Sequence, residues 1–482
     1  MIAVAYALVQ EIAKYSIAIS LAVPAIALLL IAITKEKFSR IIGMASTGIA
    51  LAVSLFLLAY LYAGHSSAIN ASIPFISSLN INFEMGINPI SFALFMMSSI
   101  VLFATSLAGN VHRIRQKATQ FLIVLFQLAS AGLFLSLNLF IFFIFWDIGV
   151  IAMFFFINSL GSESRKSAAM KFLIYEILAS SLLLFGILVI YFYTPVHSFN
   201  ISTIIANSSL IPAGEQTAIF ALLFIAFIIN IPVFPFPLWL PDAHTEAPTQ
   251  GSMLLSGILT KFGGFGVILL FEMLPISKTF GNYIAALAVI SAFYSVLAMM
   301  KQDDIKRVIA YSTITEMAIV LFGISEFSSF GLYGGVYAML SHGLLIAMLF
   351  LGAGSIEVIF NTRNIHILKG IVKNARLVAY SLLAGVFIML GLPLSSAFIA
   401  DLLIFIGAVG AFGIAGIAPL LALLLVGAFL YLIISKSFMS TGKYTRAVGS
   451  IRIEQRIAFC ILLLFIFIFG AFPFIMLSIF KI

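Results

Sequence analysis

Residues 227–266 read FIINIPVFPFPLWLPDAHTEAPTQGSMLLSGILTKFGGFG, and they decide how the rest of the chain is interpreted. An apolar helix breaks at Pro232 and three further prolines, then resumes with a lysine, Lys261, inside an apolar run. In a membrane, proline removes backbone hydrogen bonds and an ionisable side chain at mid-depth is costly. The stretch therefore predicts a broken transmembrane helix beside a buried charge, a combination that indicates an ion path.

The composition places the whole chain in a membrane. Hydrophobic residues make up 63% and charged residues 9% of the 482 residues, whereas a soluble domain carries roughly 25% charged residues. Apolar runs of about 20 residues, each long enough to cross a bilayer as a helix, recur from end to end. Residues 1–10 lack the basic region and cleavage site of a signal peptide. We therefore expect an all-α polytopic membrane protein.

The cysteine and the glycines of the chain indicate whether it could hold a metal or a cofactor. The single cysteine, Cys460, cannot form an intrachain disulfide, an iron–sulfur cluster or a zinc site. Gly263, Gly264 and Gly266 lie inside an apolar run and are interpreted as helix-packing glycines, not as a phosphate loop. We expect no cofactor and no metal in this chain, so any redox chemistry belongs to partner subunits.

Hydropathy and basic residues together predict the topology. Placing the N-terminus outside puts 19 of the 25 Lys and Arg residues inside, so both termini are expected on the outer side. The net charge of +8 is thus explained by topology and does not indicate nucleic-acid binding. Fourteen spans are predicted, at residues 17–34, 40–63, 86–108, 118–137, 138–159, 168–193, 216–240, 249–272, 280–300, 304–324, 331–358, 376–408, 416–438 and 456–478.

Two helix breaks indicate an internal repeat. The seventh span breaks at Pro232, and the twelfth breaks at Gly391-Leu392-Pro393, five spans later. An odd offset reverses direction, which predicts two inverted five-helix repeats, spans 4–8 and 9–13. The predicted division is residues 1–117 with three helices, 118–272 and 280–438 with the repeats, and 439–482 with the last helix.

Ionisable residues at mid-depth are the candidate site. Each costs roughly 2.5–3.5 kcal/mol if it faces lipid, so such residues are functional more often than not. Asp147, Lys261 and Asp401 are the strongest candidates. The alternative for each is a purely structural role, in which the side chain only makes hydrogen bonds to neighbouring helices. Glu176, Glu316 and His342 are as well explained by an interhelical hydrogen bond as by a proton relay. Lys171 lies near the inner end of its span, where a snorkelling role explains it equally well.

Several motifs carry a resemblance to a known family. Besides the opening stretch, they are FIFWDIGVIAMFFFI, RKSAAMKFLIYE, DIKRVIAYSTITEMAIVLFGI, GGVYAMLSHGLLIAMLFLGA and GLPLSSAFIADLLIFIGA. Over roughly residues 85–440 the chain resembles the antiporter-like membrane subunits of respiratory complex I. Those subunits are related to the large subunits of multisubunit Na⁺/H⁺ antiporters and of membrane-bound hydrogenases. The acid after the second break, Asp401, is similar to that of the M-type subunit.

The resemblance implies roles for particular residues. In that family a fifth-span acid pairs with a seventh-span lysine, protons pass an eighth-span lysine, and they leave near a twelfth-span residue. Carried over by position, these are Asp147 for the acid, Lys261 for the central lysine and Asp401 for the exit. The broken helices imply a hydrated cavity at mid-membrane that Lys261 borders.

The chain departs from the family pattern in its first half. Asn230 stands where the family places the seventh-span lysine, and Asp147 replaces the usual glutamate. A desolvated carboxylate without a cation favours its protonated form. We therefore expect Asp147 to be mostly protonated, unless Lys171 or a neighbouring chain supplies a cation. The half-channel is then expected to depend on water and on the carboxylates Glu176 and Glu316, which also depart from the family pattern.

These observations predict a proton-translocating membrane-arm subunit of a complex I-like quinone oxidoreductase. Expected partners are other antiporter-like and small membrane subunits, lipid, and peripheral redox subunits that carry iron–sulfur clusters, flavin or the quinone site. Two alternatives remain open. One is a subunit of a multisubunit Na⁺/H⁺ antiporter, and the other is a non-pumping scaffold subunit, which Asn230 makes worth considering.

Overall fold

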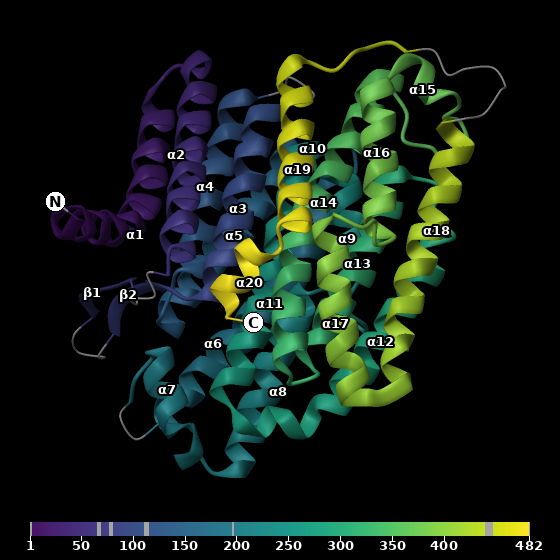
Figure 1. Cartoon of the computed structure of the whole chain (residues 1–482). Coiled ribbons are helices and arrows are strands. Elements are labelled where there is room, and N and C mark those ends of the chain that lie inside the picture. Colours follow the sequence, from purple (N-terminus) through teal and green to yellow (C-terminus); the bar gives the residue numbers. More distant parts are fainter. Residues whose placement is uncertain are drawn as a thin grey trace.

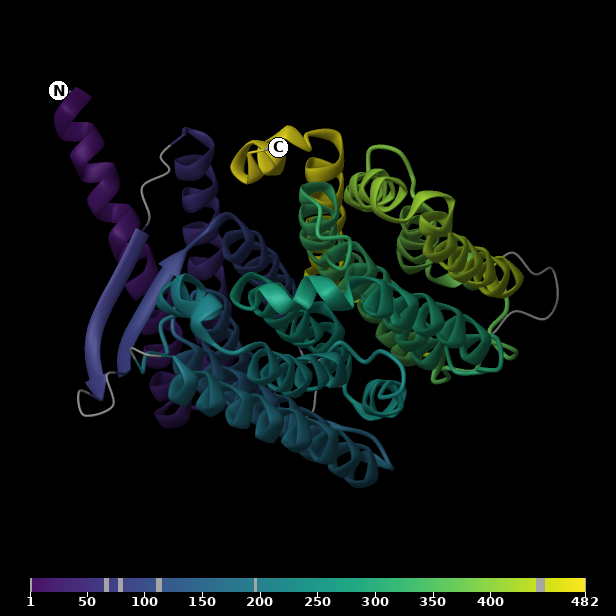
Figure 2. The ribbon, with the colours of Figure 1, turned by 90° about the horizontal axis from the view of Figure 1, so that it is seen from below.

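The chain forms a bundle of helices, most of which run in a similar direction (Figure 1). Viewed along that direction, the helices stand side by side, with a small hairpin at one edge beside the first helix (Figure 2). This computed structural model describes residues 2–64, 69–76, 81–109, 115–194, 197–438 and 447–481.

The N-terminal part contains three helices and a β-hairpin that the hydropathy pattern did not predict. Its elements are α1 (Ile2–Ile33), α2 (Glu36–Tyr62), β1 (Ile69–Ile76), β2 (Ile81–Ile87) and α3 (Pro89–Ala108). The two strands pair antiparallel. Apolar and polar residues alternate in the hairpin, and a search for continuous apolar runs overlooks such a pattern. The predicted third span accordingly began three residues too early, at residue 86.

The predicted spans 4–8 all correspond to helices, and the last two are interrupted. They comprise α4 (Gln116–Phe134), α5 (Leu139–Leu160), α6 (Arg165–Tyr193), α8 (Ala213–Asn230) with α9 (Trp239–Glu246), and α10 (Thr249–Leu254) with η3 (Leu255–Leu259) and α11 (Thr260–Met273). The short helices α7 (Ile201–Asn207) and η2 (Ser208–Leu210) connect α6 to α8. The segment η3 is π-helical and joins α10 to α11 without leaving the span.

The predicted spans 9–13 correspond to a second set of helices, of which the fourth is broken. They comprise α12 (Gly281–Met299), α13 (Ile305–Ile324), α14 (Ser329–Phe360), α16 (Arg376–Met389) with α17 (Ser396–Phe412), and α18 (Ala418–Phe438). The connecting helices are η4 (Pro275–Phe280), α15 (Ile371–Asn374) and η5 (Gly413–Ile417). That the two sets are inverted repeats stays a prediction.

The C-terminal span is shorter than predicted. Its helix α19 (Ile453–Ala471) ends before Pro473, and the separate short helix α20 (Phe474–Phe480) follows. By length and composition, 13 helical segments of the described residues could cross a membrane. One of these, Ser396–Ser437, contains both α17 and α18, and α16 is shorter than a full span. This accounts for the difference from the fourteen spans predicted.

The break in the seventh span is stabilised by side chains that take over freed backbone groups. The indole Nε1 of Trp239 donates to the carbonyl oxygen of Ile229 at 3.0 Å. The backbone N–H of Phe234 donates to Ser291 Oγ on α12, also at 3.0 Å. Non-helical backbone is tolerated at membrane depth only where protein or water satisfies it in this way.

The break in the twelfth span lies between Met389 and Ser396. Gly391 adopts a φ of +78° there, a left-handed conformation that glycine reaches without steric cost. Ser395 then caps the new helix, because its hydroxyl accepts from the N–H of Phe398 at 3.4 Å. The chain thus stops one helix and starts another within the bundle.

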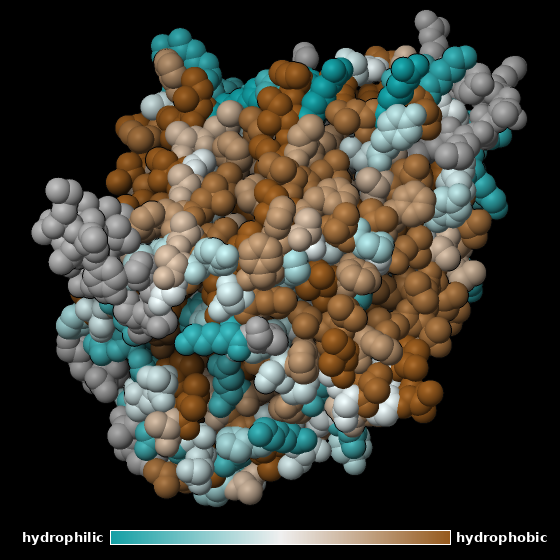
Figure 3. All heavy atoms as spheres, viewed as in Figure 1, coloured by the Kyte–Doolittle hydropathy of each residue, from teal (hydrophilic) through white to brown (hydrophobic). Residues whose placement is uncertain are grey.

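The surface shows which part faces lipid. A broad band of hydrophobic residues covers the middle of the molecule, and hydrophilic residues gather at its upper and lower ends (Figure 3). The upper end in Figure 1 holds α15 and the start of α19, with Lys373, Arg452 and Arg456; we call it the basic end. Three residues that the sequence also assigns to this side, Arg113, Lys443 and Arg446, lie outside the described residues.

Candidate functional site

Lys261 lies at the first residues of α11, directly after the π-helical segment η3. Its side chain is fully buried, and its Nζ donates to the carbonyl oxygen of Ser256 at 2.5 Å. Ser256 belongs to η3, and the same carbonyl also accepts from Thr260 Oγ1 at 3.0 Å. π-Helical turns are rare and concentrate at functional sites. Here the wider turn presents a carbonyl oxygen to an ammonium group that has no access to solvent.

The second partner of Lys261 is His342 on α14, 81 residues further along the chain. Lys261 Nζ and His342 Nδ1 are 2.6 Å apart, and both side chains are buried. When the ammonium donates, Nδ1 is the acceptor and the proton of the neutral ring sits on Nε2. That nitrogen lies 3.9 Å from Glu316 Oε2 on α13, too far for a direct hydrogen bond. His342 therefore stands between a cation and a carboxyl group.

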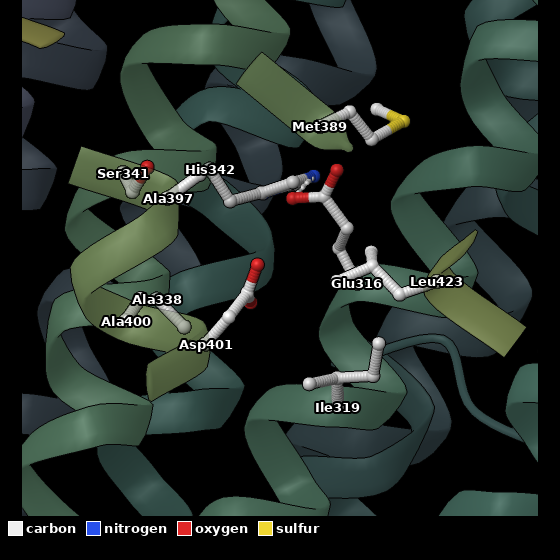
Figure 4. Close-up of a pocket in the computed structure, with 10 residues that line it drawn as sticks. All are labelled: Glu316, Ile319, Ala338, Ser341, His342, Met389, Ala397, Ala400, Asp401 and Leu423. Atoms are coloured by element: carbon white, nitrogen blue, oxygen red, sulfur yellow. Dashed lines mark ion pairs between the residues drawn. The ribbon is translucent and has the colours of Figure 1, made fainter. Parts of the chain in front are cut away.

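His342, Glu316 and Asp401 meet at one cavity. The three side chains come from α14, α13 and α17 and point into the same space (Figure 4). About 20 Å³ of it is open to the centre of a water molecule, which is room for one or two waters. Ser341 also lines the cavity and accepts a 2.8 Å hydrogen bond from Ser396 Oγ, the first residue of α17. The structure thus places α17, the second part of the broken twelfth span, beside His342 and Glu316.

In the first half, Asn230 contacts Glu176 and not Asp147. Its Nδ2 lies 3.3 Å and 3.2 Å from the two carboxyl oxygens of Glu176 on α6. Its Oδ1 accepts from the backbone N–H of Gly263, two residues beyond Lys261, at 2.9 Å. Asn230 therefore connects α6 to α11 through one amide group, and all of this lies in the buried interior.

Asp147 has a separate environment. It is half-buried on α5, and its Oδ1 accepts a hydrogen bond from Ser180 Oγ on α6 at 2.6 Å. Among the described residues it takes part in no ion pair. Lys171 does not supply a cation to it, because its Nζ lies 2.7 Å from Asp242 Oδ2 instead. The expectation that Lys171 could hold Asp147 ionised is therefore wrong for this chain.

Asp242 forms a charged cluster with two cations near the basic end. It pairs with Lys171 on α6 and, through Oδ1, with Arg307 at the first turn of α13. The three side chains line a cavity in which about 230 Å³ is open to the centres of water molecules. Lys171 is thus part of an ion-pair cluster near the basic end of the bundle. The sequence alone had left a snorkelling role open for this lysine.

Two buried groups were not among the candidates from sequence. The first is His244 in α9, whose Nε2 lies 2.6 Å from Ser256 Oγ, in the residue whose carbonyl binds Lys261. The second is Lys306 at the start of α13, which is 1% exposed and pairs with Glu357 at 3.0 Å. His244 lies in the broken-helix stretch at residues 227–266, so its position in the sequence could have indicated a functional role. Nothing in the local sequence of Lys306 indicates burial.

The ionisable side chains of the site are arranged in a row. Among the described residues, no group of three or more His, Cys, Asp or Glu side chains is placed to hold a metal ion. What the site offers is a row of proton donors and acceptors: His244 with Ser256, then Lys261, His342, Glu316 and Asp401. Intramembrane ionisable groups that face one another in this way are typical of proton paths.

Comparison with known proteins identifies the family. Residues 136–425 match the family model described as NADH:quinone oxidoreductase/Mrp antiporter, TM. The chain is 33% identical over 415 residues to NADH-quinone oxidoreductase subunit M of Rickettsia bellii, covering 84% of this chain and 83% of that protein. It is 32% identical over 377 residues to F(420)H(2) dehydrogenase subunit M of Methanosarcina mazei, covering 75% of each.

Solved structures share the fold. A chain of respiratory complex I from Thermus thermophilus superimposes with a TM-score of 0.87 at 22% identity and covers 97% of each chain. A chain of the Mrp complex from Dietzia gives a TM-score of 0.85 at 18% identity, covering 97% of this chain and 96% of that one. The chain belongs to the NADH:quinone oxidoreductase/Mrp antiporter family of transmembrane proteins.

Proposed function

We propose that this chain is a proton-translocating membrane-arm subunit of a complex I-like quinone oxidoreductase. The single observation that carries the proposal is the buried row Lys261, His342, Glu316 and Asp401, which four different helices bring together. The relatives named as quinone oxidoreductase and F(420)H(2) dehydrogenase subunits support the class of complex. In such an assembly the redox energy comes from partner subunits, and this chain contributes no redox centre.

The contacts support a particular order of proton transfer. The ammonium of Lys261 gives a proton to His342 Nδ1 across 2.6 Å, and the ring releases the proton on Nε2 toward Glu316. The 3.9 Å gap to Glu316 needs a water molecule or a small movement of the carboxyl group. Glu316 then passes the proton across their shared cavity to Asp401. The first transfer moves a positive charge from Lys261 to His342, the second neutralises the imidazolium and the Glu316 carboxylate together, and the third moves a negative charge from Asp401 to Glu316. Each charge therefore stays inside the buried row and does not face lipid.

The first half works differently in this chain, because an amide replaces a cation. The Nδ2 group of Asn230 donates to Glu176, and an amide cannot lose or gain a proton in this exchange. We infer that Glu176 is the carboxyl group that changes charge there. Asn230 transmits that change to α11, because it also holds the N–H of Gly263. Asp147 then has an accessory role.

The proposed orientation places the basic end inside and both termini outside, since basic loops stay on the inner side. Protons then enter near the Asp242 cluster and leave beyond Asp401. The proposed partners are neighbouring antiporter-like subunits and small membrane subunits, together with peripheral redox subunits that hold the flavin, iron–sulfur clusters and quinone site.

One experiment tests the function directly. The native complex with Lys261→Met is purified and reconstituted in proteoliposomes, and protons moved per electron pair are measured. We expect a lower ratio than in the parent complex with electron transfer partly retained, because methionine fills the space of lysine but carries no proton. An unchanged ratio leaves the non-pumping scaffold as the function.

The second candidate function is a subunit of a multisubunit Na⁺/H⁺ antiporter. This candidate is supported by the family description, which includes the Mrp antiporter, and by the shared fold of the chain from the Dietzia Mrp complex. Native purification separates the two. Co-purification of iron–sulfur and quinone-site subunits supports the oxidoreductase, whereas a set of membrane subunits without redox centres supports the antiporter.

A further inference from the structure

Glu326 is a buried carboxyl group at the end of the molecule opposite the basic end. It lies in the short connection between α13 and α14 and is only 7% exposed. The proposed function does not use it. A buried carboxylate is costly unless it is paired, hydrogen-bonded or protonated, so its place in the fold calls for an explanation.

The surroundings of Glu326 are shaped around its carboxyl group. A Cβ atom added to Gly331 on α14 would lie 2.2 Å from Glu326 Oε2, and one added to Gly407 on α17 would lie 1.9 Å from it. Any side chain at either position would therefore collide with the carboxyl group. The two glycines form a notch that admits Glu326, and we call it the glycine notch.

The notch holds the carboxyl group without neutralising it. Oε2 accepts one long hydrogen bond of 3.4 Å from Ser328 Oγ. Oε1 is buried and has no hydrogen-bond partner among the described residues. Burial raises the pKa of Glu326 to about 8, and the Ser328 hydrogen bond opposes that shift. A group in this state exchanges its proton near neutral pH.

The notch lies beyond Asp401 on the same helix. Gly407 follows Asp401 by six residues on α17, which is about 9 Å along the helix axis. Between them, Ile404 fills the seam against Gly323 on α13 and Gly334 on α14. Ile404 therefore packs into the helix seam between the positions of Asp401 and Gly407, where its apolar side chain opposes the entry of water.

On its far side, the notch borders water-accessible space. Ser328, which donates to Glu326, also lines a cavity at this end of the molecule, together with Glu272 of α11 and Leu332 of α14. About 220 Å³ of that cavity is open to the centres of water molecules. Glu326 is thus linked through Ser328 to water-accessible space.

We propose that Glu326 is the proton-release residue of this chain, and the proposal rests on the proposed function. Glu326 first loses its proton to a water molecule in the outer cavity and becomes a carboxylate. Asp401 then loses its carboxyl proton to a water molecule that passes Ile404, and that water gives a proton to Glu326 Oε1, which restores the protonated state. No electron moves in either step. The glycine notch receives Oε2, and the buried Oε1, which has no hydrogen-bond partner among the described residues, is free to accept.

The test uses the whole complex in proteoliposomes, with protons moved per electron pair as the readout. Glu326→Gln keeps shape but cannot carry a proton, so the ratio is expected to fall as far as it does in Lys261→Met. Glu326→Asp keeps a carboxyl group and is expected to retain most of the parent ratio. Glu215→Gln is the matched control, because Glu215 is a partly exposed carboxyl in the first turn of α8, outside the proposed path, and its ratio should equal that of the parent.

The outcomes separate the two proposals. If Lys261→Met lowers the ratio and Glu326→Gln does not, Glu326 has no part in release, while the proposed function stands. If neither variant lowers the ratio, the proposed function itself fails. Should Glu326→Gln not assemble, Glu326→Ala replaces it, since alanine leaves the notch empty. A full ratio with alanine then refutes the role, and a ratio restored only by aspartate supports it.

Discussion

At the scale of single residues, the charge state of each group depends on its immediate partners. Lys261 has a carbonyl oxygen and an imidazole nitrogen within 2.6 Å, and both accept from an ammonium group. Within the part of the chain that the structure describes, the donor to Glu176 is an amide and the donor to Asp147 is a hydroxyl. The second half therefore contains a row of donors and acceptors, whereas these two carboxyl groups of the first half have no cationic partner among the described residues.

Replacing Lys261 by methionine is expected to abolish proton movement through this chain, because His342 loses its proton donor. Lys278→Met is the matched control, since Lys278 is an exposed lysine in η4, far from the row. Proton pumping in proteoliposomes should be lost in the first variant and unchanged in the second. Equal pumping in both would remove Lys261 from the path.

Asp147→Asn is expected to reduce pumping less than Glu176→Gln. Asparagine at 147 still accepts the hydrogen bond from Ser180, whereas glutamine at 176 removes the carboxyl group that faces Asn230. The proton-to-electron ratio of the two variants, measured side by side, decides the matter. A larger loss for Asp147→Asn would mean that Asp147 has an essential cationic partner in a neighbouring subunit.

Asn230→Lys would restore the residue that the family pattern has at this position. An ammonium group here lies beside both oxygens of Glu176, so we expect an ion pair with Glu176 and not with Asp147. The N–H of Gly263 loses its acceptor at the same time, at a cost of about 1–3 kcal/mol. Pumping and thermal stability should both fall, and Glu176→Gln in the same background should restore neither.

At the scale of elements, the broken and irregular helices position the reactive side chains. The π-helical η3 turns the Ser256 carbonyl toward Lys261, and the break before α17 lets Asp401 face Glu316. The contact between α14 and α17 is close because glycines line it, and the glycine notch is part of that contact. Helix packing at these seams therefore controls the path.

Gly407→Ala is expected to expel Glu326 from the glycine notch, because the added methyl group overlaps its carboxyl oxygen. Overpacking of this kind costs roughly 1–3 kcal/mol. Gly410→Ala, three residues later on α17, meets no atom within 4 Å and is the matched control. Pumping should fall in the first variant only. A fall in both would point to a general effect on α17.

At the scale of the whole molecule, the chain presents a lipid-facing band and two polar ends. The charged cluster around Asp242 joins the starts of α6 and α13, toward the basic end, and Glu326 lies in the connection between α13 and α14, at the opposite end. The buried row occupies the middle of the same bundle. The proposed entry region, relay and exit therefore lie in one chain, at successive depths of the same bundle.

Asp401→Asn is expected to slow pumping without loss of assembly, because the amide keeps the shape of the carboxyl group but cannot pass a proton from the row to the exit. The measurement is the rate of proton uptake or release by proteoliposomes at a fixed rate of electron transfer. If only Asp401→Ala disturbs the complex, through loss of assembly, the residue is structural.

Much of the fold can be predicted from the sequence, because the apolar pattern that indicates a transmembrane helix lies within one continuous segment of the chain. Apolar runs gave the helices, prolines and Gly391 gave the breaks, and charge within apolar runs gave Asp147, Lys261 and Asp401 as mid-depth candidates. The hairpin β1–β2 was missed, because its period of two carries no continuous apolar run. The motifs were specific enough to identify the family.

Only the tertiary structure decided which charges meet. Sequence gives the depth of a residue along its helix, but which neighbour it faces depends on how helices far apart in the chain pack against one another. Lys261 meets His342 across 81 residues, Lys171 meets Asp242 and not Asp147, and Glu326 enters a notch that two other helices form. These partners determine where a proton can move, and no local pattern contains them.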